Sequence, residues 1–500
     1  MSDVPQSMEL LDEPVLQFAE GQCIEHPRTG LSLFGPYSSR GIEMPRDLNY
    51  ALVGTEKGIQ TFQGLAALLE RPIFSPPQMD EVLWPHYPGF EEATHARFTA
   101  LSACNESVDE QRLLAAVNQG DDHKRVFDVV NVYLDGIAAI ARKDDPVDVV
   151  VCVVPEIVYL NCRPLSRVTA GVGKRLSAKE LHTRRQHRDL FDAYDPEQYE
   201  YSLDFRRQIK ARSMEHRKPI QIVRDTTLRL SDENEFGKRQ LTPLSDRAWN
   251  LSTALLYKGG GKPWKLPSAR PGVCYVGIAF KRTSESGRTA CSAAQMFLDD
   301  GDGVVFLGDY GSWYSPYDKQ CHLTRDAARR LLAGVLDTYA EQHGKPLQEV
   351  FLHSRSTIDD EEWAGYTEAC PAGATIVGIR VAPDRIGLRG YRPGSRPVVR
   401  GAFWKLSNRR AYLWASGFKP VLRTYDGSNV PEPLAIEIQH GDADIRLVAE
   451  DILRLTKLNY NTCKVGESQP VTVHFSDAVG EILVANRAAD YFLPNFKYYV

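Results

Sequence analysis

The sequence lacks any hydrophobic run long enough to cross a membrane. Its longest unbroken aliphatic stretch, Val149 to Val154, falls far short of the ~20 residues that a membrane-spanning helix needs. Residues 1–14 are acidic and polar, without the basic and apolar regions of a secretory signal. We therefore expect a cytoplasmic protein with no membrane partner.

The sequence also lacks paired cysteines and an excess of positive charge. Its nine cysteines form no C-x-x-C pair, and several lie in apolar, strand-like runs, as expected of buried reduced thiols rather than a zinc site. The net charge of −5 excludes a globally basic coat for nucleic acid. It leaves a local basic channel open, because residues 203–229 contain eight Lys or Arg against three acidic residues.

What is present indicates two α/β domains, since 500 residues exceed what one hydrophobic core usually organises. Residues 148–154 form a continuous β-branched run, typical of a strand buried on both faces of a parallel sheet. We expect a helix before it, at 121–142, and a helix, a strand and a helix after it, at 203–215, 219–223 and 246–258. This alternation predicts a Rossmann-like first domain.

The pattern changes after three glycines at 259–261 and a proline-containing segment at 265–272, so we place the domain boundary between residues 268 and 269. Three successive strands are then expected, followed by a helix, a strand and a helix. Their predicted ranges are 273–281, 290–298, 304–307, 324–343, 349–353 and 359–369. Because this order is that of ribonuclease-H-like folds, we predict an α/β chain with a Rossmann-like domain over 1–268 and a ribonuclease-H-like domain over 269–500.

Four polar residues of the first domain form a candidate phosphate site. Arg206 and Lys210 are four residues apart, so they share one face of a helix. Gln221 lies on the next strand, and Lys258 closes the following helix. Cations and an amide that converge from neighbouring elements suit a terminal phosphate, although basic residues on a helix also commonly form a solvated face.

Nucleotide-binding loops do not explain these residues. The segment Gly259–Lys262 resembles a P-loop only superficially, because the full motif is absent and Pro263 follows the lysine. No G-x-G-x-x-G follows a predicted strand, which opposes the alternative of a Rossmann-type small-molecule enzyme.

The second domain lacks the carboxylates of a two-metal nuclease. Such a site needs acidic residues on the first strand, on a helix or loop, and after the fourth strand, where two metal ions are held. Ala279 stands at the first of these positions and Arg355 at the last. An arginine would repel the metal ions, so we expect no cleavage here.

Several segments resemble a known family, the short prokaryotic Argonautes, which consist of MID and PIWI domains without a PAZ domain. The resemblance covers nearly the whole chain and is most specific around the guide 5′-end pocket. The segments are Gly30–Pro36, Lys210–Val223, Trp249–Leu266, Arg400–Gly417 and Leu458–Asp477. The last two resemble later strands of the PIWI domain.

The resemblance implies roles for particular residues. Lys210, Gln221 and Lys258 match positions that bind the phosphate of a guide, and Arg206 stands where the family has Tyr or Arg. The C-terminal carboxylate, here that of Val500, folds back toward this phosphate in the family, often through Mg²⁺, with Gln221 as a further candidate ligand. Members that cleave carry a DEDX tetrad.

This sequence departs from the tetrad at Ala279 and near Arg355, whereas Asp477 falls near its fourth position. The resemblance thus implies a small 5′-phosphorylated guide RNA and a complementary single-stranded DNA target, without slicing. It also implies a separate effector chain that carries an APAZ region fused to a sirtuin-like, TIR or nuclease domain. The pair would act in defence against plasmids and phages, through NAD⁺ depletion and abortive infection or DNA degradation. A guide-directed slicing nuclease with a divergent site remains the alternative.

Overall fold

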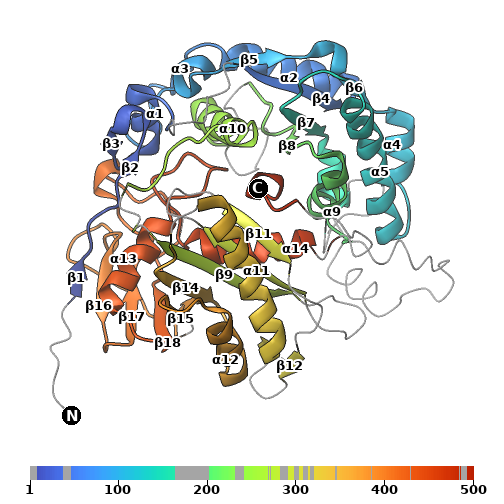
Figure 1. The fold of residues 1–500 in the computed structure, drawn as a ribbon. Coiled ribbons are helices and arrows are strands. Elements are labelled where there is room, and N and C mark those ends of the chain that lie inside the picture. Colours follow the sequence, from blue (N-terminus) through green and yellow to red (C-terminus); the bar gives the residue numbers. More distant parts are fainter. Residues whose placement is uncertain are drawn as a thin grey trace, which may run out of the picture.

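Two separate β-sheets organise the chain in its computed structural model, one above the other in Figure 1. The structure describes residues 8–500 except 38–46, 164–201, 231–240, 268–269, 271, 282–290, 298–302, 308–312, 316–319, 344–345, 385, 428, 484 and 486–492. The C-terminus lies between the two sheets, and the helices of the first sheet arch over it (Figure 1). No helix in this described part is long and apolar enough to span a membrane.

The first sheet is parallel and has five strands in the order β5-β4-β7-β8, with β6 also paired to β4. Its strands are β4 (Asp47–Gly54), β5 (Arg97–Ala100), β6 (Glu106–Ser107), β7 (Val149–Val154) and β8 (Ile220–Arg224). Its helices are α1 (Pro27–Phe34), α2 (Glu56–Leu69), α3 (Phe90–Thr94), α4 (Glu110–Val117), α5 (Asp122–Ala141), α6 (Glu156–Asn161), α9 (Phe205–Ser213) and α10 (Leu244–Lys258). The Rossmann-like character predicted from the sequence is confirmed.

Strand β7 shows why this sheet is layered by helices on both faces. Successive side chains of a strand point to opposite faces. Val149, Val151 and Val153 pack into a core that includes α2 and α10, whereas Val150 and Cys152 pack into a second core that includes α5 and α9. All six residues of β7 are buried, so the uninterrupted aliphatic run is needed to cover both faces.

The second sheet is mixed and has nine strands in the order β1-β16-β17-β18-β15-β14-β9-β10-β11. Its strands are β1 (Met8–Leu10), β9 (Val273–Lys281), β10 (Cys291–Phe297), β11 (Gly303–Leu307), β14 (Glu349–Ser354), β15 (Thr375–Pro383), β16 (Ala402–Lys405), β17 (Arg410–Leu413) and β18 (Leu434–His440). Strands β9, β10 and β11 are antiparallel, and β14 then pairs parallel with β9. This is the ribonuclease-H-like order predicted from the sequence.

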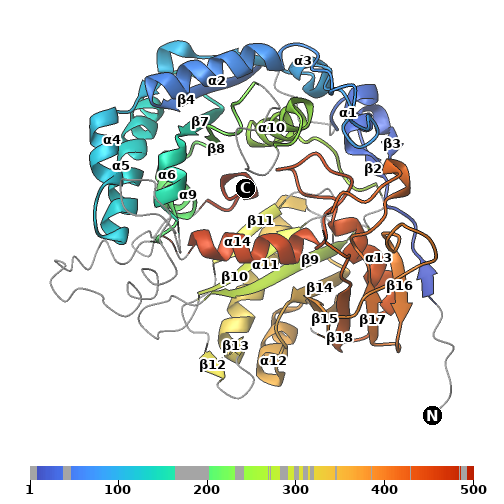
Figure 2. The same ribbon diagram turned by 180° about the vertical axis from the view of Figure 1, so that it is seen from behind.

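Helices cover both faces of the second sheet. They are α11 (Arg325–His343), α12 (Asp360–Ala369), α13 (Ile445–Leu455) and α14 (Val471–Leu483). Helix α11 lies in front of the sheet in Figure 1, and α14 lies in front of it in Figure 2, seen from behind, so the two cover opposite faces. A short hairpin of β12 (Trp313–Ser315) and β13 (Gln320–His322) lies beside α12, and β2 (Leu16–Gln17) and β3 (Cys23–Ile24) form another.

Helix α14 corrects the prediction that its segment would be a late strand. Its buried residues Val471, Phe475 and Val479 recur every four residues, which is a helical spacing. The start of the helix lies directly on β9, since a Cβ at Gly277 would be 1.9 Å from the Thr472 carbonyl oxygen. A short valine-rich run is ambiguous in sequence, and packing on the sheet decides for the helix.

The N-terminal segment joins the second sheet rather than the first. Strand β1 pairs with β16 at the sheet edge. Just beyond it, half-buried Glu13 forms ion pairs of 2.8 Å with buried Arg400 and 2.8 Å with buried Lys457. Burial makes these pairs specific in geometry, because an unpaired charge there would be costly. The domain boundary at 268/269 lies outside the described residues and stays a prediction.

Candidate nucleic-acid interface

A cavity of about 370 Å³ opens where α9, β8, α10 and the C-terminus meet. Three of the four predicted phosphate-site residues line it, namely Arg206, Lys210 and Gln221, together with Val500. The fourth, Lys258, reaches the same place from the end of α10, because its Nζ donates a hydrogen bond to the C-terminal oxygen of Val500. The structure therefore brings all four residues and the C-terminus together.

Local structure explains how α9 presents its two cations. The Asp204 side chain caps the helix by accepting a hydrogen bond from the Arg207 backbone N–H at 3.0 Å. Arg206 and Lys210 then follow one turn apart on the same face. The Arg206 side chain is exposed at the mouth of the cavity, whereas Lys210 is buried, with 3% of its surface accessible.

The C-terminus is held inside the molecule by both lysines. Lys210 Nζ donates to the Tyr499 carbonyl oxygen at 2.9 Å and also to the C-terminal oxygen that Lys258 contacts. A short 3-10 turn, η5 (Phe496–Tyr498), precedes it. Phe496 of this turn packs edge-on against Phe475 of α14, with ring centroids 4.9 Å apart. The last residue is thus positioned by packing as well as by charge.

Burial makes the charge of the two lysines depend on a neighbouring anion. Burial, together with a smaller effect of the nearby Arg206 charge, lowers the pKa of Lys258 to about 7. Burial also lowers the pKa of Lys210 well below its ordinary value, and the charges of Lys258 and Arg206 add to this shift. The neighbouring carboxylate of Val500 opposes both shifts, since an opposite charge favours the protonated amine. A further anion in the cavity would do the same.

Gln221 offers an oxygen to the same cavity. Its side-chain amide donates to the Ile222 carbonyl oxygen at 3.1 Å, while its buried Oε1 has no hydrogen-bond partner. Carboxylate and amide oxygens are ligands that Mg²⁺ accepts, so Val500 and Gln221 fit a magnesium ion in donor type. Because Lys210 and Lys258 surround that carboxylate, such an ion would need an additional anionic ligand.

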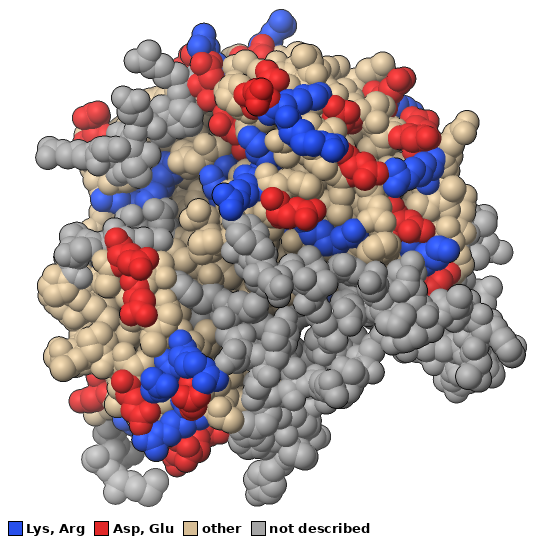
Figure 3. All heavy atoms as spheres, turned by 45° about the vertical axis from the view of Figure 1, so that its right-hand side comes forward, with Lys and Arg blue, Asp and Glu red and all other residues tan. Residues whose placement is uncertain are grey.

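A second cavity, of about 570 Å³, adjoins the first and shares Asn250 with it. Trp84 and Pro243 contribute apolar walls, and a buried ion pair of Arg28 with Asp246 contributes polar ones. Away from these cavities, the described surface on the face drawn in Figure 3 is not continuously basic. On the face in Figure 3, Lys and Arg side chains alternate with Asp and Glu side chains.

Two of the positions at which a two-metal nuclease needs carboxylates occur on or directly after neighbouring strands of the second sheet. The parallel register pairs Ile278 of β9 with Ser354 of β14, and the next residues, Ala279 and Arg355, directly follow this pair. Arg355 donates to the Gln469 side-chain oxygen at 2.5 Å. Asp477 lies on α14, and its side chain is outside the part that the structure describes.

Comparison with known proteins identifies the fold through three-dimensional likeness. No protein-family model and no curated protein matches the sequence. The Argonaute of Clostridium butyricum, solved with a guide DNA and a 19-mer target DNA, aligns over 96% of this chain and 53% of its own, with a TM-score of 0.59 and 15% identity. The Argonaute of Aquifex aeolicus, solved with externally bound siRNA, aligns over 98% of this chain and 56% of its own, with a TM-score of 0.58 and 15% identity.

The chain has the Argonaute fold. Its parallel sheet and its mixed sheet are consistent with the MID and PIWI architecture predicted from the sequence. The chain spans just over half the length of the Argonautes that it resembles.

Two residues that line the cavity of this Argonaute-like chain were not predicted from the sequence. Asn250 and Arg247 line the cavity from α10. A signal was present, since Asn250, Ala254 and Lys258 are spaced by four residues and therefore share a helix face. Because Asn250 lies on the same helix face as the predicted phosphate-binding residue Lys258, it was a candidate to contact the ligand.

Proposed function

We propose that this chain binds the 5′-phosphorylated end of a small guide RNA and uses it to recognise complementary single-stranded DNA without cutting it. The observation that carries the proposal is the convergence of Arg206, Lys210, Lys258 and Gln221 on one cavity beside the C-terminus. Such a pocket suits the end of a nucleic-acid strand, because only an end can enter it with a terminal phosphate.

The charge of the pocket supports a phosphate as its ligand. With both lysines protonated, Arg206, Lys210 and Lys258 contribute three positive charges, and the Val500 carboxylate compensates one, which leaves two. A terminal phosphate carries a charge of about −1.5 to −2 at neutral pH. Each hydrogen bond between a buried ammonium group and such an oxygen is charge-assisted and stronger than a neutral one.

Magnesium fits this proposal as a bridge between the chain and the guide. Val500 would supply a carboxylate oxygen and Gln221 its Oε1, with phosphate oxygens as the additional anionic ligands. The ion would neutralise charge where carboxylate and phosphate approach each other. We expect chelation of Mg²⁺ to weaken a 5′-phosphorylated guide and to leave a 5′-hydroxyl guide unchanged.

Binding is tested by extracting nucleic acid from the purified protein and by titrating labelled guides. We expect short 5′-phosphorylated RNA in the extract. Because the C. butyricum protein was solved with a guide DNA, RNA and DNA guides of one sequence should be compared directly. A protein that carries no short nucleic acid and shows no preference for a 5′ phosphate would contradict the proposal.

We further propose that the chain does not cleave its target. Ala279 supplies no metal ligand, and the cationic Arg355 directly after the neighbouring strand disfavours two divalent ions. Incubation of the guide-loaded protein with labelled complementary DNA and either Mg²⁺ or Mn²⁺ should leave the target intact. Guide-directed products that persist after removal of contaminating nucleases would support the slicing alternative.

The signal would then pass to a partner chain with an APAZ region and a sirtuin-like, TIR or nuclease effector domain. The support is the resemblance of the sequence to short Argonautes, whose effector domain lies on a separate chain, together with the Argonaute fold of this chain. We expect co-expression with such a chain to yield a heterodimer and the isolated chain to be poorly soluble. Addition of target DNA should trigger NAD⁺ loss or DNA degradation only in the heterodimer.

A further inference from the structure

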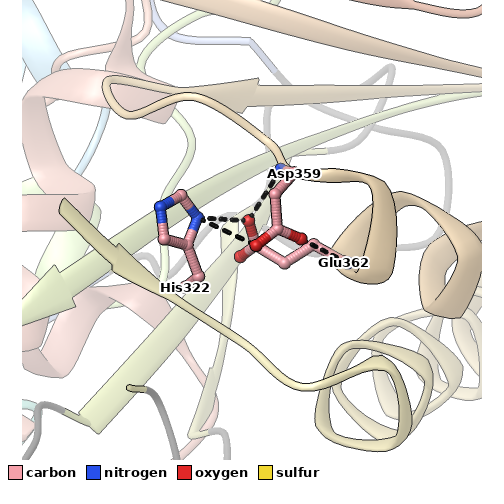
Figure 4. Close-up of side chains that lie close together, drawn as sticks. All are labelled: His322, Asp359 and Glu362. Carbon is pink, nitrogen blue, oxygen red and sulfur yellow. Dashed lines mark hydrogen bonds and ion pairs between the residues drawn. The ribbon is translucent and has the colours of Figure 1, made fainter. Parts of the chain in front are cut away.

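Three metal-ligating side chains meet far from the guide pocket, on the face of the second sheet that α11 and α12 cover. His322 ends strand β13, Asp359 caps the N-terminus of α12, and Glu362 lies in its first turn. Figure 4 shows the His322 ring directed at both carboxylates. Among the described residues, these three side chains form the one group of His, Cys, Asp or Glu whose ligand atoms lie close enough together to hold one ion.

The spacing of the three side chains suits a single coordinated ion. His322 Nδ1 lies 3.0 Å from Glu362 Oε2 and 3.5 Å from Asp359 Oδ2. One ligand atom from each residue falls within 4.8 Å of the others. Ligands about 2.1 Å from a tetrahedral zinc ion are roughly 3.4 Å apart, so small side-chain adjustments would complete the geometry.

Backbone groups already orient both carboxylates. Asp359 Oδ1 accepts a hydrogen bond from the Glu362 N–H at 2.8 Å, and Glu362 Oε1 accepts one from the Leu323 N–H at 2.9 Å. These bonds direct Asp359 Oδ2 and Glu362 Oε2 toward His322. Glu362 Oε2 also accepts from the Asp359 N–H at 3.1 Å and keeps a lone pair for a metal. Partners of this kind fix ligand orientation in metal sites.

The site carries more negative charge than its protein partners balance. The ion pairs of Asp359 and Glu362 are with the one His322 ring, and neither pairs with a lysine or arginine in the described structure. Glu362 and His322 are each only 2% exposed. Burial raises the pKa of Glu362, which reflects the cost of keeping that carboxylate charged. A divalent cation would remove this cost, because buried carboxylates are normally paired or bind metal.

An unpartnered hydroxyl beside the cluster is a second, independent indication of a missing ligand. Tyr366 follows Glu362 by one helical turn and is 1% exposed, yet its hydroxyl has no hydrogen-bond partner. Burial and then the charges of Glu362 and Asp359 raise its pKa well above the ordinary value, so the hydroxyl lies within their electrostatic reach. A water on a metal ion would give this group a partner.

We propose that His322, Asp359 and Glu362 bind one divalent transition-metal ion of the zinc class, which joins β13 to the start of α12. The ring binds through Nδ1, so its proton resides on Nε2. The partly exposed Asp359 side chain provides the route by which the ion enters. The role of the ion is structural, and the proposal is independent of guide binding.

The test measures metal in the full-length protein after any polyhistidine tag has been removed. Wild-type protein is equilibrated with Zn²⁺ or Co²⁺, dialysed, and analysed for bound metal, visible Co²⁺ absorption and thermal unfolding. Two variants remove a ligand, His322→Gln and Glu362→Gln. Glu362→Gln keeps an oxygen acceptor for the Leu323 N–H and leaves the Asp359 side-chain cap of α12 in place, and it loses the bond that Oε2 accepts from the Asp359 N–H. The control, Glu368→Gln, removes a carboxylate from the same helix that pairs with exposed Arg325.

Wild type and the Glu368→Gln control should retain about one equivalent of metal, show a tetrahedral Co²⁺ spectrum and unfold at a higher temperature with Zn²⁺. His322→Gln and Glu362→Gln should bind the ion at least tenfold more weakly and show no shift. Equal metal content in all four proteins, or no binding by wild type in excess Zn²⁺, would overturn the proposal. Circular dichroism of each variant verifies that it is folded.

Discussion

Replacement of Lys210 by alanine should weaken the binding of 5′-phosphorylated guides by about ten- to a hundredfold. Lys210 is 3% exposed and lines the cavity that we propose for the phosphate, so its loss removes a buried positive charge from that cavity. A charge-assisted hydrogen bond contributes roughly 1.5–3 kcal/mol, and each 1.4 kcal/mol is a factor of ten in affinity. A guide with a 5′ hydroxyl never makes this bond and should bind nearly as before.

Fluorescence anisotropy with two guides of one sequence, differing only at the 5′ end, measures the effect. The matched control is Arg207→Ala, which removes a cation from the same helix that pairs with Glu481 at 2.7 Å and does not line the cavity. If Lys210→Ala weakens both guides alike, or if Arg207→Ala shows the same selectivity, the residues form a general basic face and the reasoning is refuted.

Lys210 also holds the C-terminus, so its loss could act through folding. Lys258 still binds Val500 in the variant, which keeps that carboxylate from being left without a buried partner. Lys210→Met retains the apolar stem and separates the two effects. A variant that unfolds like wild type but loses the preference for the phosphate identifies a binding role.

Three further perturbations follow from the same geometry. A Gly-Ser extension after Val500 moves the terminal carboxylate away from the two lysines and should reduce the affinity for 5′-phosphorylated guides at least tenfold. An equal extension at the N-terminus should leave that affinity unchanged. Equal effects of the two extensions would contradict the placement of the C-terminus. Because burial lowers the pKa of Lys258 to about 7, its protonated fraction falls as the pH rises, so phosphate-dependent affinity should decline by up to about tenfold per unit between pH 7 and 9; a flat profile would show that Lys258 stays charged. Burial lowers the pKa of His26 and of His353 from 6.5 to about 3. Below pH 6.5 the unfolded state therefore binds more protons than the folded state. As the pH is lowered from 6.5, the free energy of unfolding should fall by about 1.4 kcal/mol per pH unit for each histidine. Urea unfolding at pH 7, 6 and 5 measures this slope, and His353→Gln should reduce it. An unchanged slope in that variant would show that other groups cause the sensitivity to acid.

The elements of the fold were largely predictable because hydrophobic periodicity is local. The run Val149–Val154 indicates a strand buried on two faces, and the structure places it at the centre of the parallel sheet. The three strands from Val273 onward, and the helix and strand after them, also form where expected. Arg206 and Lys210 share a helix face for the same local reason, since 3.6 residues complete one turn.

Tertiary structure alone decided which distant residues meet. Lys258 and Lys210 contact a C-terminus that lies 242 and 290 residues away in sequence. No periodicity encodes such a contact, because it depends on how α9, α10 and η5 pack around one cavity. The family resemblance suggested it, and the structure supplies its geometry.

The same distinction explains the wrong strand prediction and the unexpected edge strand. Val471–Leu483 is apolar enough for either structure, and contact of its backbone with Gly277 on β9 selects the helix. Strand β1 pairs with β16, almost 400 residues later, because Glu13 beyond it finds buried cations there. The sequence by itself determined the local elements and the residue types of the pocket, through spacing along the chain. Only the tertiary structure decided which faces meet, because burial of apolar surface and pairing of buried charge depend on the whole assembled chain.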